Sequence, residues 1–263
     1  MPLVDINGTT LFVQIDGPED APWLICSNSL GATHLMWSPQ MDLFTRHHRV
    51  LRYDTRGHGK SAALTAPYQL ADLVSDVVDL MDHHGIETAD YIGLSLGGMT
   101  GLGLALDHAD RINRLICCDA RADAPPPFAK MWDERIADVD ASGVAALWPG
   151  TLERWLTPSF QAQHAEVVDQ LKADFEQTSA EGYKGCAAAI RGLDYLRHLG
   201  KVSSPVLYVG GDQDSGAQPE TMCAMADATP GAAFRVIPDA AHIANVDNAD
   251  AFNAAVAGFL DQA

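Results

Sequence analysis

The chain has 263 residues, of which 47% are hydrophobic and 20% are charged. This ordinary globular composition argues against a disordered chain and is enough for one large domain or for a domain with an insertion. The chain has 17 Lys and Arg residues and 35 Asp and Glu residues, so its formal net charge is −18. Such a charge opposes binding to nucleic acid or to an anionic membrane, and an anionic substrate would need a local cluster of arginines.

The N-terminal residues show no targeting segment. The first ten, MPLVDINGTT, contain no basic region, no apolar core and no small-residue cleavage site, so we expect a cytoplasmic protein. The five cysteines are irregularly spaced, which favours free, mostly buried thiols and no metal site. They are Cys26, Cys117, Cys118, Cys186 and Cys223.

Short apolar runs rich in β-branched residues alternate with helical patterns along the chain. The apolar runs predict strands over residues 10–16, 23–27, 48–54, 89–94, 112–119, 205–210 and 233–238. The amphipathic stretch LADLVSDVVDLMDHHG, which ends at Gly85, predicts a helix between the third and fourth of these strands. Strands that alternate with helices imply an α/β protein with a mostly parallel central sheet flanked by helices.

Residues 122–199 interrupt this alternation. The segment has no β-branched run, is broken by prolines and contains three of the five tryptophans, Trp132, Trp148 and Trp155. The strand pattern returns at SSPVLYVGG, so we expect a helical cap insertion that divides one domain. Residues 1–121 and 200–263 would then form the core, and residues 122–199 the cap.

The uncharged stretch YIGLSLGGMTGLGLAL follows a predicted strand and opens a predicted helix. It is shorter than the roughly 20 apolar residues that a transmembrane helix needs. Its GLSLG sequence is typical of a nucleophile elbow, in which the serine stands on a tight turn between strand and helix. Gly93 and Gly97 would let these two elements approach each other, which makes Ser95 the candidate nucleophile.

A serine hydroxyl needs a base to accept its proton, and the base needs a carboxylate to orient it. In proteins with such an elbow the carboxylate precedes the histidine in the chain. His242 follows the last predicted strand, and Asp212 and Asp214 follow the strand before it. Each lies at the carboxyl end of a strand, where open α/β sheets bind their ligands. Chemistry alone does not separate the two aspartates; we favour Asp214, with Asp212 as the alternative.

Acyl transfer also needs an oxyanion hole made of two amides. One would be the N–H of Leu96, the residue after the nucleophile. The other would come from the loop in LICSNSLG, where a strand ends in small and polar residues. We choose Leu30, with Asn28, Ser29 and Gly31 shaping the turn.

Five segments together resemble the α/β-hydrolase superfamily over essentially the whole chain: SNSLG, LRYDTRGHGKS, IGLSLGGMTGL, GGDQD and DAAHIANVDNADAF. The middle segments MWDERI, LERWLTP and EGYKGCAAAIRGLD resemble 3-oxoadipate enol-lactonases. These are cofactor-free enzymes of aromatic catabolism that open a five-membered enol-lactone bearing a carboxymethyl group. The resemblance implies a serine hydrolase without a cofactor, acting on a small, anionic ester or lactone. Self-association into a homo-oligomer stays open.

A carboxylated substrate implies a site for its carboxylate. The candidates are Arg121, which follows a predicted strand at the mouth of the site, and Arg135 in the insertion, because a guanidinium group can hold a carboxylate with two hydrogen bonds. Trp132 and Trp155 would pack against the lactone ring. The alternative is that the arginines form surface ion pairs and that the tryptophans form the core of the insertion.

Other functions remain open. They are the hydrolysis of other small esters or lactones, a cofactor-free haloperoxidase-like side activity, and a ligand receptor built on the same fold. A haloalkane dehalogenase is disfavoured because its elbow carries Asp where this chain has Ser95. The segment RYDTRGHGKS lacks the glycine spacing of a phosphate-binding loop, so we assign it a structural turn and no chemistry.

Overall fold

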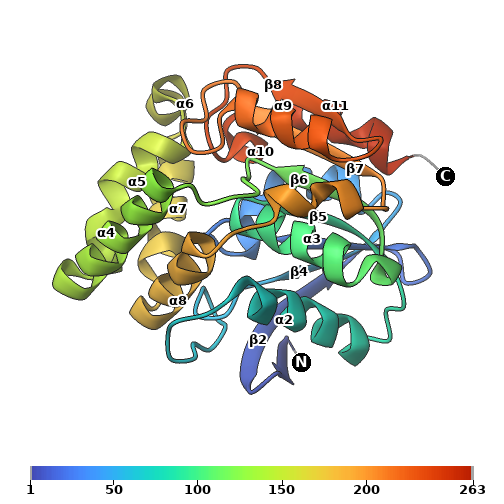
Figure 1. The fold of residues 1–263 in the computed structure, drawn as a ribbon, viewed down its shortest axis with the longest axis horizontal. Helices are drawn as coiled ribbons and strands as arrows, with labels where there is room; N and C mark the ends of the chain where they lie inside the picture. The colour runs from blue at the N-terminus through green and yellow to red at the C-terminus, as the bar shows by residue number, and fades with distance from the viewer. Residues whose placement is uncertain (1, 262–263) are drawn as a thin grey trace.

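An eight-stranded sheet runs through the computed structural model, which describes residues 2–261 (Figure 1). In sheet order the strands are β1 (Leu3–Ile6), β2 (Thr9–Asp16), β4 (Arg49–Tyr53), β3 (Trp23–Ser27), β5 (Ala89–Leu94), β6 (Ile112–Cys118), β7 (Val206–Gly211) and β8 (Ala233–Ile237). The pairs β1–β2 and β2–β4 are antiparallel, and every later pair is parallel. The predicted mostly parallel sheet is therefore confirmed.

The seven predicted strands agree with β2 to β8 to within about one residue at either end, but β1 was missed. β1 is only four residues long and pairs with β2 through a turn at Asn7 and Gly8, both of which have positive φ. An Asn-Gly dipeptide is a strong hairpin signal, because its residues tolerate the left-handed backbone that a two-residue turn requires. That dipeptide was the sequence signal that could have found this strand.

Helices cover the sheet and form a separate group beyond it. The helices that flank the sheet are α1 (Met41–Phe44), α2 (Leu70–His83), α3 (Leu96–Asp107), α9 (Pro219–Ala228), α10 (Ala244–Asp247) and α11 (Ala249–Leu260). Four short 3-10 helices span His34–Gln40, Ala109–Arg111, Val144–Leu147 and Leu196–Lys201. The predicted amphipathic helix corresponds to α2, which ends two residues before Gly85.

The central strands are apolar throughout because both of their faces are covered. Every residue of β5 and β7 is buried, as expected for parallel strands with helices on both sides. α3 follows β5 and lies close to the sheet; a Cβ added at Gly101 would come within 2.6 Å of Leu115 and 2.7 Å of Tyr91. This close contact fixes the start of α3 at the carboxyl ends of the central strands.

Five helices form the insertion between β6 and β7, and Figure 1 shows them together at one end of the molecule. They are α4 (Pro126–Ser142), α5 (Trp148–Trp155), α6 (Pro158–Gln163), α7 (Ala165–Glu176) and α8 (Ala180–Arg191). The helical cap insertion is thus confirmed, whereas the exact division at residues 122 and 199 stays a prediction. The chain enters and leaves side by side: Tyr195 N donates to Ala122 O at 2.7 Å, and Ala124 N donates to Leu193 O at 3.0 Å.

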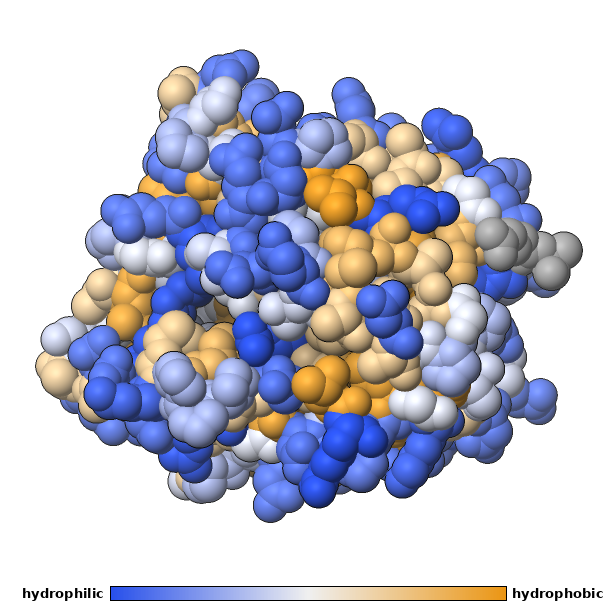
Figure 2. All heavy atoms as spheres, turned by 45° about the horizontal axis from the view of Figure 1, so that its top comes forward, coloured by the Kyte–Doolittle hydropathy of each residue, from blue (hydrophilic) through white to orange (hydrophobic). Residues whose placement is uncertain are grey.

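Polar and charged residues cover most of the face drawn in Figure 2, and apolar residues occupy smaller patches between them. Within residues 2–261, no helix is both long enough and apolar enough to cross a membrane. Over the same residues, no group of three or more His, Cys, Asp or Glu side chains is arranged to hold a metal ion.

Candidate active site

Ser95 stands on a strained turn between β5 and α3. Its backbone has φ 54° and ψ −111°, a conformation that residues other than glycine rarely adopt. A Cβ at Gly93 would lie 2.2 Å from Gly97 O, and one at Gly97 would lie 2.3 Å from Ser27 O. Only glycine fits at either position, and the turn so formed raises Ser95 above the ends of the central strands.

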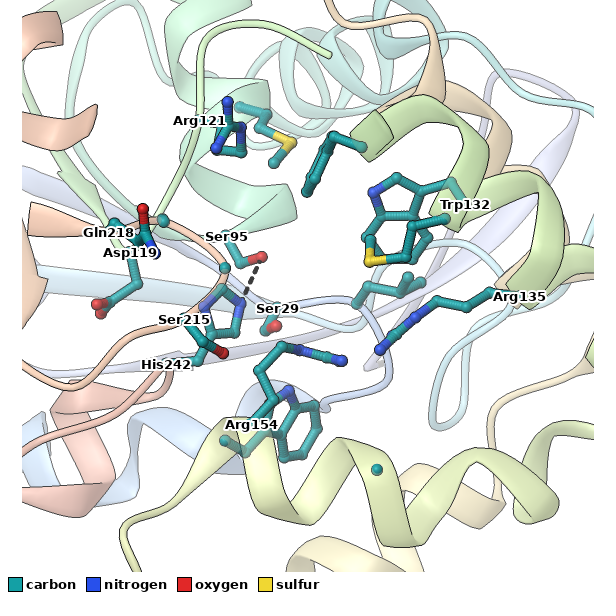
Figure 3. A pocket seen from close by; sticks show the side chains of 18 of the residues that line it. Ser29, Ser95, Asp119, Arg121, Trp132, Arg135, Arg154, Ser215, Gln218 and His242 are labelled. Atoms are coloured by element: carbon teal, nitrogen blue, oxygen red, sulfur yellow. Dashed lines mark hydrogen bonds between the residues drawn. The ribbon is translucent and has the colours of Figure 1, made fainter. Parts of the chain in front are cut away.

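His242 and Asp214 meet Ser95 from two loops that follow the last two strands. His242 Nε2 lies 3.0 Å from Ser95 Oγ (Figure 3), and His242 Nδ1 lies 2.8 Å from Asp214 Oδ2. The other carboxylate oxygen of Asp214 accepts a hydrogen bond from Gly216 N at 2.7 Å. Burial alone would raise the pKa of Asp214, but His242 and the amides of Gly216 and Ala217 outweigh it and lower the pKa. Asp214 is therefore a buried carboxylate that orients the imidazole.

Asp212 lies in the same loop but faces a different partner. It is exposed, and its Oδ1 accepts a hydrogen bond from Ala240 N at 3.2 Å, which joins two loops at the surface. Asp214, by contrast, is 2% exposed. The structure therefore brings Asp214, and not Asp212, beside His242.

The two candidate oxyanion-hole residues come from the elbow and from the loop after β3. Leu96 is the first residue of α3, so its amide has no acceptor within the helix. Leu30 lies in the loop after β3 and lines the cavity described below. Within residues 2–261, neither amide donates a hydrogen bond to the protein backbone or to a side chain. Gly97 N donates to Asn28 O at 3.0 Å, which ties this loop to the elbow.

His58 supports the loop after β3 through a hydrogen bond, a role that the sequence analysis missed. Its Nε2 accepts a hydrogen bond from Gly31 N at 2.9 Å, and its Nδ1 lies 3.1 Å from Arg56 O. This pattern fits a neutral ring that donates from Nδ1 and accepts at Nε2. Burial lowers the pKa of His58, which favours this neutral form. The segment at residues 52–61 begins in β4 and turns after Tyr53, and its His58 holds Gly31, the residue next to Leu30.

A cavity of about 560 Å³ opens over Ser95 and His242, between the core and the cap. It is lined by all four residues that the sequence analysis chose for substrate binding: Arg121, Trp132, Arg135 and Trp155. Trp155 also packs edge-on against Trp148 and Phe175, with ring centroids 6.0 and 5.9 Å away. Trp155 therefore belongs both to the cavity wall and to the core of the cap.

The arginines of the cavity differ in their partners. Arg121 forms an ion pair with Asp123 at 3.2 Å and stacks over Phe128 at 4.9 Å. Arg135 lies over Trp132 at 5.2 Å and donates a long hydrogen bond of 3.4 Å to the Tyr183 hydroxyl. Among the ion pairs of residues 2–261, none involves Arg135. Of the two arginines chosen from the sequence, Arg135 therefore has the uncompensated charge.

Two further residues of the cavity were missed by the sequence analysis. Arg154, on α5, extends its guanidinium group into the cavity (Figure 3). Asp119 lies at the end of β6, where its Oδ1 accepts from Gly211 N at 2.8 Å and its Oδ2 has no partner among residues 2–261. Burial and the neighbouring Asp214 raise the pKa of Asp119 well above its usual range, which favours the neutral form of this carboxyl group. Arg154 directly precedes Trp155 in the chain, but the sequence does not show that both side chains reach the cavity.

Comparisons with known proteins identify the family of the chain. Residues 22–249 match the family described as alpha/beta hydrolase fold. The chain is 37% identical over 243 residues to 3-oxoadipate enol-lactonase 2 of Acinetobacter baylyi, a match that covers 91% of this chain and 89% of that protein. The crystal structure of the enol-lactonase from Burkholderia xenovorans LB400 superposes with a TM-score of 0.96 at 39% identity, covering 99% of this chain and 100% of that one.

An esterase from Thermogutta terrifontis, whose structure was solved with malate bound, is also similar. Its TM-score is 0.89 at 27% identity, and the match covers 98% of this chain and 96% of that one. The chain therefore belongs to the α/β-hydrolase family, as a hydrolase of its enol-lactonase and esterase group. The resemblance expected from the sequence motifs is confirmed.

Proposed function

We propose that the protein is a serine hydrolase that opens a carboxylated enol-lactone, 3-oxoadipate enol-lactone, to 3-oxoadipate in the catabolism of aromatic compounds. The observation that carries this proposal is the series Ser95, His242 and Asp214, joined at 3.0 and 2.8 Å beneath a cavity that contains arginines. The two enol-lactonases reported above support the choice of substrate.

In this reaction Ser95 Oγ attacks the lactone carbonyl while His242 Nε2 accepts the hydroxyl proton. Asp214 holds the imidazole in the required tautomer and stabilises its charged form. The amides of Leu30 and Leu96 donate to the oxyanion of the tetrahedral intermediate. The ring C–O bond then breaks, and His242 gives its proton to the enolate oxygen, which leaves an acyl-enzyme.

The second half of the reaction uses the same groups. His242 takes a proton from water, whose oxygen attacks the acyl carbon, and returns the proton to Ser95 as the ester bond breaks. The released enol becomes a ketone, which draws the reaction forward. When the substrate is bound, Trp132 and Trp155 pack beside its ring. Arg135, which forms no ion pair among the described residues, binds its carboxylate. Arg121 is the second candidate, although it would first have to leave Asp123.

Replacing Ser95 with alanine tests the chemistry. We expect Ser95→Ala to lower kcat/KM on the enol-lactone by roughly 10⁴ or more, because the nucleophile is absent, while circular dichroism shows an unchanged fold. Ser203→Ala, at an exposed serine before β7, is the matched control and should keep full activity. Retained turnover in Ser95→Ala would refute the proposed mechanism.

The choice of substrate is tested separately, by steady-state kinetics of the wild type on the enol-lactone and on p-nitrophenyl acetate. We expect kcat/KM to be at least about 10²-fold higher for the enol-lactone, since its carboxylate and its fit to the cavity add binding energy that the acetate ester lacks. Equal values would instead favour the second candidate function, an esterase of other small esters, which the likeness to the Thermogutta esterase supports.

A further inference from the structure

Arg154 is the most unusual charged group in the cavity. Its side chain is partly buried, yet within residues 2–261 it takes part in no side-chain hydrogen bond and in no ion pair. An unpaired charge that has lost part of its water is costly, so such groups are expected where a ligand of opposite charge binds. Folding alone does not account for its position, because a polar neutral side chain would avoid this cost.

A second guanidinium group faces Arg154, that of Arg135, which forms no ion pair among residues 2–261. Figure 3 shows Arg135, from α4, and Arg154, from α5, pointing toward each other across the cavity. Burial and the charge of Arg135 lower the pKa of Arg154 to about 10, so Arg154 stays charged near neutral pH. Two facing cations repel each other unless an anion lies between them, and the rest of the chain has a formal charge that is strongly negative.

The remaining charged groups that line the cavity do not neutralise this pair. Arg121 is already balanced by Asp123 at 3.2 Å. Asp119 has its pKa raised by burial and by Asp214, which favours its neutral form, and within residues 2–261 it forms no ion pair with either arginine. Glu153 is exposed and forms no ion pair with either arginine among the described residues. Among the described residues, the cavity therefore offers one site where two positive charges converge without an ion-pair partner.

The position of Arg154 places this site next to the candidate catalytic groups. A Cβ built on Gly216 would lie 3.7 Å from Arg154 Cδ, 3.6 Å from His242 Nδ1 and 3.3 Å from Asp214 Oδ1, so the stem of Arg154 passes over the loop that holds the carboxylate. The carbonyl of Arg154 also accepts a hydrogen bond from His242 N at 3.3 Å. Arg154 therefore contacts the histidine loop through its backbone carbonyl, and its side chain faces the cavity.

We infer that Arg154 and Arg135 together form an anion subsite that binds the carboxylate arm of the substrate, an inference that rests on the proposed hydrolysis of a carboxylated lactone. Each guanidinium group donates to the same carboxylate, which holds the lactone carbonyl over Ser95. The same subsite binds the carboxylates of the product, so small dicarboxylates are competitive inhibitors.

The test measures inhibition and does not require turnover of the enol-lactone. Hydrolysis of p-nitrophenyl acetate is followed in the presence of adipate, a dicarboxylate, or of adipamide, its neutral diamide. Arg154→Gln should raise the inhibition constant of adipate about 10- to 100-fold, the range expected for losing charge-assisted hydrogen bonds, and should leave that of adipamide within about twofold. Circular dichroism and a thermal unfolding curve that match those of the wild type show that the variant is folded.

Three comparisons sharpen the test. Arg154→Lys keeps the charge and should restore part of the adipate affinity. Arg135→Gln should match Arg154→Gln, and the double variant should lose less than the product of the two effects, because the two groups share one anion. Arg191→Gln removes an exposed cap arginine that pairs with Asp133 outside the cavity, and should leave both inhibition constants unchanged.

Two results would overturn the subsite: adipate that fails to inhibit the wild type at tens of millimolar, or an adipate inhibition constant within twofold of wild type in Arg154→Gln. Effects of Arg135→Gln and Arg154→Gln that simply multiply would overturn the sharing of one anion. If the wild type shows no preference for the enol-lactone while adipate inhibition depends on Arg154, the proposed function fails and the subsite stands.

Discussion

At the scale of single residues, two aspartates of one loop differ completely in their surroundings. Asp214 is buried and accepts hydrogen bonds from His242 and Gly216, whereas Asp212 is exposed and bonds to Ala240 N. Because a carboxylate orients an imidazole only through direct contact, the loop supplies one candidate triad acid and one residue that stabilises a turn.

This difference predicts opposite results for two matched substitutions. Asp214→Asn should lower kcat on the order of 10⁴-fold, because an amide cannot stabilise the charged imidazole and favours the wrong tautomer. Asp212→Asn should leave kcat within about twofold. Steady-state kinetics on p-nitrophenyl acetate measures both, and equal losses in the two variants would contradict the assignment of Asp214.

At the scale of elements, the turn after β4 supports the loop after β3. His58 accepts from Gly31 N only while its Nε2 is unprotonated, and burial lowers its pKa in the folded protein below the ordinary value near 6.5. As the pH falls below about 6.5, the unfolded chain therefore binds this proton before the folded chain does. The stability that neutral His58 contributes is present above that pH and is lost as the pH falls.

Replacing His58 with glutamine removes this titration. We expect His58→Gln to be less stable than the wild type at pH 7.5, and the difference in the free energy of unfolding to shrink by at most about 1.4 kcal/mol per pH unit below 6.5. Urea unfolding at several pH values measures it. His164→Gln, at an exposed cap histidine, should follow the wild type at each pH, and a constant difference for His58→Gln would count against this role.

At the scale of the whole molecule, the cap is joined to the loop that contains the candidate base. The carbonyls of Arg154 and Trp155 accept from the amides of His242 and Ile243 at 3.3 and 3.1 Å. Asp247, at the end of α10, accepts from Thr157 N and Oγ1 and from Ala241 N, at 2.9, 2.9 and 2.7 Å. The cap therefore lines part of the cavity and also holds the loop that contains His242.

Removing the Asp247 carboxylate should weaken this junction. Asp247→Ala leaves buried donors of Thr157 and Ala241 without a partner, so we expect the free energy of unfolding to fall by about 2–4 kcal/mol, and kcat to fall as the histidine loop loosens. Asp169→Ala, at an exposed residue in the middle of α7, should change stability by less than about 0.5 kcal/mol. Equal stability of the two variants, measured by urea unfolding, would refute the role of Asp247.

Much of the fold was predictable because its signals are local. Apolar β-branched runs, helical spacing and the glycines of GLSLG each report on a few neighbouring residues, and together they predicted seven of the eight strands, the cap insertion and the family. β1 escaped because four residues that include an aspartate show too little alternation. The candidate roles of Ser95, His242 and Asp214 followed from their order along the chain, and remain proposals for the experiments above.

The sequence by itself determined the order of the strands along the chain, the strained position of Ser95, and which loops bring a histidine and a carboxylate to the same edge of the sheet. Only the tertiary structure decided that Asp214 rather than Asp212 reaches His242, that His58 holds Gly31, and that Arg154 faces Arg135 with no ion pair to either group among residues 2–261. The physical reason is that backbone conformation depends on near neighbours in the chain. The partners and the solvation of a charged side chain depend instead on segments far apart in sequence that meet only when the cap packs over the core.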